Sequence, residues 1–186
     1  MTLQVHKLCQ EAAPGILESI KPQLLIAIGG GGYVPARILR SFLKTPGSPN
    51  IPIQAIGLSL YESLPTDVVE EPGTKVTRTQ WLDFTALGEI NNLVGKRVLI
   101  VDEVDDTRTT LEYAVKELEK DVEEARIKLG SKEETHFSIF VLHVSARAGM
   151  SCSACIWDRG YLRSETEQGQ TKEGRPSPDY DGRESV

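Results

Sequence analysis

Long apolar runs, cysteines and an excess of basic residues are all missing or scarce in this chain of 186 residues. No apolar run is long enough to cross a membrane, and no apolar leader with a cleavage site opens the sequence. The three cysteines, Cys9, Cys152 and Cys155, are too few and odd in number for a disulfide framework. The net charge of -6 argues against nucleic acid as the main partner, because neutralising the many phosphates of a nucleic-acid backbone needs clustered lysine and arginine. We therefore expect a cytoplasmic protein with neither a nucleic-acid nor a membrane partner.

Short apolar runs alternate with helical patterns along most of the chain. The strand candidates are residues 24–28, 53–60, 75–82, 98–101 and 137–142. Apolar residues recur at helical spacing in residues 5–20, 34–43 and 111–129. We expect Pro14 and Gly15 to kink or interrupt the first of these helices. Strands that alternate with helices predict an α/β fold with a mainly parallel sheet flanked by helices.

Two stretches lack such a pattern. Residues 61–73 hold two prolines, a glycine and several acids, which is typical of a functional lid loop or a disordered loop. From residue 144 onward the chain is polar and rich in glycine, serine and arginine, so it cannot bury enough apolar surface to offset the entropy of ordering. The sequence thus predicts a domain at residues 1–143 and a disordered tail at residues 144–186.

The stretch VLIVDEVDDTRTT, residues 98–110, joins an apolar run to four acids and a threonine cluster. Amide groups and hydroxyls at a helix start can hold a phosphate. Carboxylates beside it would repel that phosphate unless hydroxyls or a hydrated cation lie between them, and a sugar phosphate with Mg²⁺ supplies both. A solvated acidic loop with threonine caps is the alternative. The position at the end of a strand, where parallel sheets bind ligands, favours the binding site.

Four consecutive glycines, Gly29 to Gly32, follow the first strand candidate. They let backbone N–H groups approach an anion closely, although a tight turn would explain them as well. A dinucleotide fingerprint is excluded because Val34 stands where its third glycine should be, and the lysine of a P-loop is absent. Both loops follow strand ends, so we expect them to face one cleft. Phosphoribosyl pyrophosphate (PRPP) carries the phosphate, ribose hydroxyls and pyrophosphate that such a cleft would take.

VLIVDEVDDTRTT resembles the PRPP-binding motif of the type I phosphoribosyltransferases. IAIGGGGYVPARILRSFL resembles the pyrophosphate loop and following helix of the fungal hypoxanthine-guanine and xanthine-guanine branch, and the resemblance covers about residues 5–143. It implies the type I phosphoribosyltransferase fold with a flexible lid loop. It also implies a purine salvage enzyme that uses Mg²⁺ and converts PRPP and hypoxanthine, guanine or xanthine to IMP, GMP or XMP and pyrophosphate. Members are usually homodimers or homotetramers.

The resemblance further implies roles for single residues. Asp106 would act as the general base that takes the purine proton, although it could also cap a helix. Asp102 and Glu103 would bind the ribose hydroxyls and, through water, the Mg²⁺. The pyrophosphate would be held by Gly29, Gly30 and Gly31. The 5′-phosphate would be held by Asp106, Thr107, Arg108, Thr109 and Thr110. The lid candidates are Tyr61, Lys75 and Arg78.

The chain departs from the family after residue 143. Family members usually place a lysine there that reads the purine 6-oxo group, whereas this chain has Val144, Ser145, Ala146 and Arg147. Arg147 could substitute for the lysine. A second interpretation is therefore a catalytically impaired or regulatory protein that binds PRPP or nucleotides on the same fold. Retention of Asp106 favours the enzyme, because a pure binder has no need of a general base.

Overall fold

A computed structural model describes residues 2–60, 76–82, 93–106, 108–145 and 152–158 of the chain. Three helices and six strands follow one another in these residues. The helices are α1 (Thr2–Ser19), α2 (Tyr33–Phe42) and α3 (Thr109–Leu129). The strands are β1 (Leu24–Ile28), β2 (Ile53–Leu60), β3 (Val76–Gln80), β4 (Arg97–Asp105), β5 (His136–Val144) and β6 (Cys152–Asp158).

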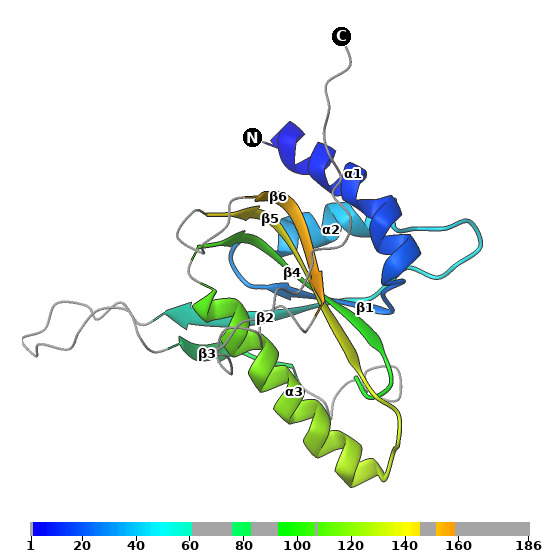
Figure 1. The fold of residues 1–186 in the computed structure, drawn as a ribbon, viewed down its shortest axis with the longest axis vertical. Helices are drawn as coiled ribbons and strands as arrows, with labels where there is room; N and C mark the ends of the chain where they lie inside the picture. Colours follow the sequence, from blue (N-terminus) through cyan, green and yellow to red (C-terminus); the bar gives the residue numbers. More distant parts are fainter. Residues whose placement is uncertain (1, 61–75, 83–92, 107, 146–151, 159–186) are drawn as a thin grey trace, which may run out of the picture.

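The six strands form one sheet in the order β3-β2-β1-β4-β5-β6 (Figure 1). The four inner strands run parallel to one another, and β3 and β6 pair antiparallel at the two edges. Parallel strands with intervening helices confirm the predicted α/β fold. The carboxyl ends of β1 and β4, which are neighbours, come to the same edge of the sheet.

Helices cover both faces of the sheet: α1 and α2 pack on one face and α3 on the other (Figure 1). Alternate side chains of each inner strand supply the two cores. In β4, Val98 and Ile100 pack with α3, whereas Leu99 and Val101 pack with α1 and α2. Because both faces are buried, β1 and residues 98–101 of β4 are continuously apolar rather than alternating, which is why the sequence could predict them.

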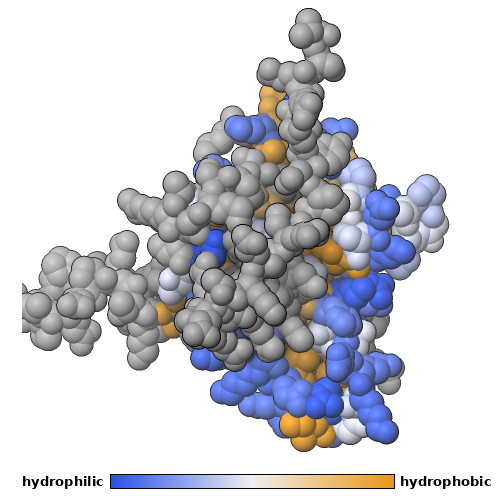
Figure 2. Space-filling view, viewed as in Figure 1, coloured by the Kyte–Doolittle hydropathy of each residue, from blue (hydrophilic) through white to orange (hydrophobic). Residues whose placement is uncertain are grey.

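The outer surfaces of the helices are mostly polar. Figure 2, in the same view as Figure 1, shows hydrophilic residues over much of the described surface around α3. Among the described residues, no helix is both long and apolar enough to span a membrane.

Helix α1 continues through Pro14, so the interruption allowed by the sequence does not occur. Proline removes one backbone hydrogen bond, to the carbonyl of Gln10. Gln10 and Pro14 are both exposed, so water can satisfy that carbonyl. The buried neighbours Ala13 and Ile16 hold the helix against the sheet on both sides of the proline.

The expected disordered tail also needs correction in part. Residues 152–158 form β6, which pairs with β5 along its length, from Ser138 opposite Asp158 to Val144 opposite Cys152. Cys155 and Trp157 of this strand are buried against the core. The apolar pattern of this strand was too short to stand out in a polar segment. The rest of the predicted tail lies outside the described residues, and the boundary at residue 143 stays a prediction.

Gly32, the last glycine of the run, has no room for a side chain. A Cβ atom at this position would lie 2.8 Å from the carbonyl oxygen of Ile28 and would overlap the carbonyl oxygen of Val101. Its φ of −70° suits any residue, so space alone demands glycine. We infer that this close approach seats the start of α2 against β1 and β4.

Gly32→Ala should therefore lower the free energy of unfolding by about 1–3 kcal/mol, since the added methyl meets backbone atoms that cannot rotate away. Gly15→Ala is the matched control, because a Cβ at Gly15 in α1 meets nothing within 4 Å. This control should gain about 0.5–1 kcal/mol from helix propensity. Urea unfolding measures both changes, and equal stability of Gly32→Ala and wild type would contradict the packing argument.

Candidate active site

The glycine turn and the acidic end of β4 lie in contact. Ala27 of β1 pairs with Val101 of β4, so the residues that follow each lie side by side. A Cβ atom at Gly31 would lie 2.5 Å from both Cβ and Oε2 of Glu103. The two loops thus form one site at the carboxyl edge of the sheet, where parallel sheets bind ligands.

The glycine turn leaves its backbone accessible. Gly30 has a φ of +95°, which side-chain-bearing residues rarely adopt, and both Gly29 and Gly30 are exposed. The N–H of Gly29 donates to the carbonyl of Ile56 at 2.5 Å and so fixes the start of the turn to β2. Helix α2 begins immediately after the turn, and the positive end of its dipole lies at the same edge.

Asp102 and Glu103 lie inside β4. The sequence had suggested that they follow the end of the strand. The strand is longer than the apolar run because its pairing with β5 continues to Asp105 opposite Val144. Consecutive strand residues point to opposite faces. Glu103 therefore lies on the α2 side with Gly31, and Asp102 lies on the α3 side.

Burial strongly perturbs Asp102, whose residue surface is only 8 % exposed. The loss of solvent raises its pKa from 3.8 to about 7. The backbone N–H of Glu103, which donates to Oδ1 at 2.8 Å, opposes that rise, and the charges of Asp105 and Glu103 add to it. A carboxyl group with a raised pKa at a strand end is a candidate for binding a cation or hydroxyl groups.

Asp105, for which the sequence suggested no role, organises the turn into α3. Its Oδ1 accepts the N–H of Arg108 at 2.8 Å, and its carbonyl accepts the N–H of Ser145 at 2.9 Å. Burial raises the pKa of Asp105, whereas the N–H and then the charge of Arg108 lower it. This carboxylate therefore holds the backbone of the turn.

Arg108 differs from the expectation in two ways. It is the N-cap of α3, in the left-handed conformation with a φ of 62°, so Asp106 does not cap this helix. Its side chain is buried, and Nε lies 3.9 Å from Oδ2 of Asp105. The side chain of Arg108 is thus buried in the turn, whereas Thr109 and Thr110 at the start of α3 are both partly buried. Thr107 lies outside the described residues.

Asp106 lies in the turn between β4 and α3 and is partly buried. The hydroxyl of Ser145 donates to its Oδ1, and the same hydroxyl lies 3.3 Å from its carbonyl oxygen. The end of β5 therefore holds the turn that carries the predicted general base.

Val104 belongs to the site but was not predicted from the sequence. Val104 is 45 % exposed and lies between the partly buried Glu103 and the buried Asp105 in β4. An exposed apolar surface among carboxylates can pack against the flat face of an aromatic ligand. The signal in the sequence was a lone apolar residue within the acidic run.

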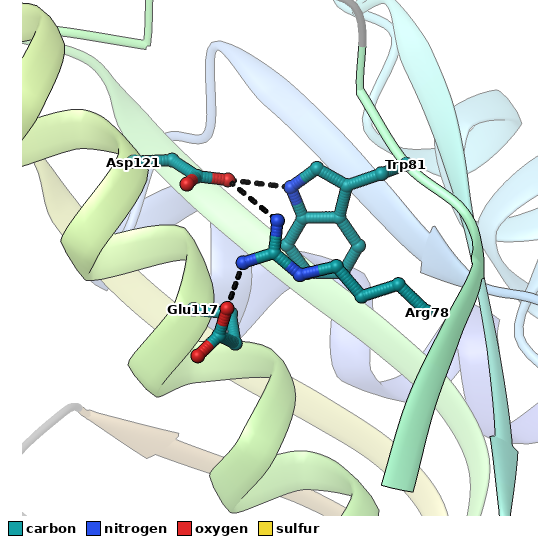
Figure 3. Close-up of polar contacts among 4 residues, drawn as sticks. All are labelled: Arg78, Trp81, Glu117 and Asp121. Atoms are coloured by element: carbon teal, nitrogen blue, oxygen red, sulfur yellow. Dashed lines mark hydrogen bonds and ion pairs between the residues drawn. The ribbon is translucent and has the colours of Figure 1, made fainter.

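Arg78, one of the lid candidates, lies on β3 against the side of α3 (Figure 3). Its guanidinium pairs with Glu117 and with Asp121, the latter at 3.5 Å, and lies 4.1 Å from the ring centre of Trp81. Nε1 of Trp81 also donates to Asp121, at 2.5 Å. We call these four residues the β3–α3 clasp, and the structure places the side chain of Arg78 in it. Tyr61 and Lys75 lie outside the described residues.

Asp102→Asn should change how stability depends on pH. Between pH 3.8 and about 7 the folded protein holds a proton on Asp102 that the unfolded chain has lost, so this group makes stability fall as pH rises. Asparagine removes that penalty. We expect the free energy of unfolding of the variant to exceed that of wild type by up to about 4 kcal/mol at pH 8 in EDTA. The difference should vanish near pH 4. Urea unfolding across this range measures it, and a difference independent of pH would contradict the assignment.

Comparison with known proteins agrees with this geometry. Residues 1–130 match the phosphoribosyl transferase domain family. The chain is 62 % identical over 141 residues to a hypoxanthine-guanine phosphoribosyltransferase of Schizosaccharomyces pombe, a match that covers 75 % of this chain and 68 % of that protein. It is also 62 % identical over 169 residues to xanthine phosphoribosyltransferase 1 of Saccharomyces cerevisiae, covering 87 % of this chain and 80 % of that protein.

Among solved structures, a purine phosphoribosyltransferase of Pyrococcus horikoshii is similar, with a TM-score of 0.53 and 28 % identity over 80 % of this chain and 78 % of that one. The matched segments include β1, β4, the glycine turn and the start of α3, which together form the site described above. The resemblance predicted from the sequence is thus confirmed, and the chain belongs to the phosphoribosyl transferase family.

Proposed function

We propose that this protein transfers the phosphoribosyl group of PRPP to a 6-oxopurine base, hypoxanthine, guanine or xanthine, and releases IMP, GMP or XMP and pyrophosphate. The contact between Gly31 and Glu103 carries the proposal, because it joins an anion-binding turn to carboxylates that suit ribose hydroxyls. The names of the two fungal relatives, at 62 % identity, support the same substrates.

Gly29, Gly30 and Gly31 bind the pyrophosphate group in this proposal. The exposed backbone of Gly29 and Gly30, the partly exposed Gly31 and the dipole of α2 offer partial positive charge without long side chains, so the anion can approach closely. The same groups stabilise the negative charge that develops on pyrophosphate as it leaves the ribose.

Asp102 and Glu103 bind the ribose hydroxyls in this proposal. Hydroxyl donors satisfy carboxylates that burial has deprived of water. The raised pKa of Asp102 means that its ionised form is poorly solvated, so a hydrogen-bond donor or a cation would stabilise it.

These carboxylates also fit Mg²⁺. The described residues contain no group of three or more His, Cys, Asp or Glu that could hold a metal ion by itself. One or two carboxylates are what Mg²⁺ takes from a protein when substrate phosphates and water complete its octahedral shell. We therefore assign Asp102 and Glu103 to Mg²⁺ through water. When bound, the ion neutralises charge on the pyrophosphate.

The turn from Asp106 to Thr110 binds the 5′-phosphate. Helix α3 begins there, so its dipole and first-turn amides favour an anion. Asp105 fixes the turn through Arg108, which places the hydroxyls of Thr109 and Thr110 at the helix start.

Asp106 is the general base in this proposal, and Val104 supports the purine ring. As the purine nitrogen attacks C1 of the ribose, the purine must lose a proton, which the Asp106 carboxylate accepts. Val104 lies two residues away and exposes an apolar surface of the kind that a flat ring covers.

We further propose that the protein is cytoplasmic and forms a homodimer or homotetramer. Sedimentation would test the oligomeric state.

The experiment incubates the protein with Mg²⁺, PRPP and each of hypoxanthine, guanine, xanthine and adenine, and measures pyrophosphate release. Turnover is expected with one or more 6-oxopurines and not with adenine. Asp106→Asn should lower kcat by about 10²-fold or more, as expected for a lost general base. Glu124→Gln, which removes an exposed carboxylate from α3, is the control and should leave kcat unchanged.

PRPP or nucleotide binding without turnover would overturn the enzyme and support the second interpretation, a regulatory binding protein. That interpretation draws on residues 144–147, where the family lysine is missing. A normal rate for Asp106→Asn would instead remove this residue from the mechanism while leaving the function intact.

A further inference from the structure

Ser145 directly follows β5 and reaches across to the turn after β4. The two strands pair up to Asp105 opposite Val144, so Ser145 lies beside Asp106. Its N–H donates to the carbonyl of Asp105 at 2.9 Å, which extends the strand pairing by one residue. Its hydroxyl donates to Oδ1 of Asp106 and lies 3.3 Å from the Asp106 carbonyl oxygen.

We propose that Ser145 is a positioning residue that orients the carboxylate of Asp106 for proton transfer. The inference rests on the proposed function, because it needs Asp106 to be the base. Ser145 itself touches neither substrate in this account. It acts by holding the Asp106 carboxylate through Oδ1 in one orientation.

The two residues differ in how firmly the fold holds them. Ser145 is anchored through its backbone to the sheet, next to Val144, which is fully buried. Asp106 lies in a turn, where its side chain has two rotatable bonds and a partly solvated surface. A hydrogen bond from the sheet to that carboxylate removes side-chain freedom before substrate binds, which is how supporting residues preorganise a site.

The chemistry of the donor also suits this task. A serine hydroxyl is neutral, so it orients the carboxylate without neutralising the charge that makes it a base. Its bond to an ionised acceptor is stronger than one between neutral groups. The sequence pointed to residues 144–147 only as a departure from the family, whereas the structure gives Ser145 a defined partner.

The test compares kcat and the KM for PRPP in Ser145→Ala, Ser145→Thr and wild type. Loss of the hydroxyl should lower kcat about tenfold, the scale of a hydrogen bond to a charged group, and should leave the KM for PRPP within about twofold. Threonine keeps the hydroxyl and should restore most of kcat. Ser138→Ala removes a buried hydroxyl from the same strand, remote from Asp106, and serves as the control.

A double-mutant cycle with Asp106→Asn decides whether Ser145 acts through Asp106. Ser145→Ala should cost little further rate in the Asp106→Asn background, because the group that it positions is already lost. An equal tenfold loss in both backgrounds, a similar loss in Ser138→Ala, or a normal kcat for Ser145→Ala would each overturn the positioning role while leaving the function standing. Absence of turnover by wild type would overturn both proposals.

Discussion

The close approach of the glycine turn to β4 is the constraint on which the site depends. Gly32 has backbone carbonyls where a Cβ would be, and Gly31 lies against the side chain of Glu103. Any side chain at these positions would separate α2 from β4 and move the glycine turn away from the carboxylates. The parallel pairing of β1 with β4 sets this contact, and the two apolar cores on either face of the sheet maintain it.

Charge is distributed over this framework so that each acid has a separate environment. Asp105 is buried and bonded to the backbone of Arg108, so it serves the fold. Asp102 is buried with a raised pKa, which makes it ready for a donor or cation. Asp106 is partly solvated and held by Ser145. The dipoles of α2 and α3 offer positive potential at both ends of a ligand that lies between them.

The parallel sheet and the contact between the two loops could be predicted from the sequence, because buried apolar runs and consecutive glycines are visible within short stretches of the chain. The sequence was insufficient where tertiary contacts decide. Pairing with β5 extends β4 past its apolar run to Asp105. Helix α1 continues through Pro14 because the carbonyl that loses its hydrogen bond is exposed to water. The role of Arg78 depends on the β3–α3 clasp, whose two acids lie 39 and 43 residues away in the sequence.

Hydrogen exchange with and without PRPP and Mg²⁺ tests the central claim most directly, namely that the glycine turn and the acidic end of β4 bind one ligand. The account predicts slower exchange of amides in both residues 29–34 and residues 102–111, with the same dependence on PRPP concentration. Residues 120–129 of α3, at the far end of that helix, should not change. Protection confined to one of the two segments, or found only elsewhere, would contradict a shared site.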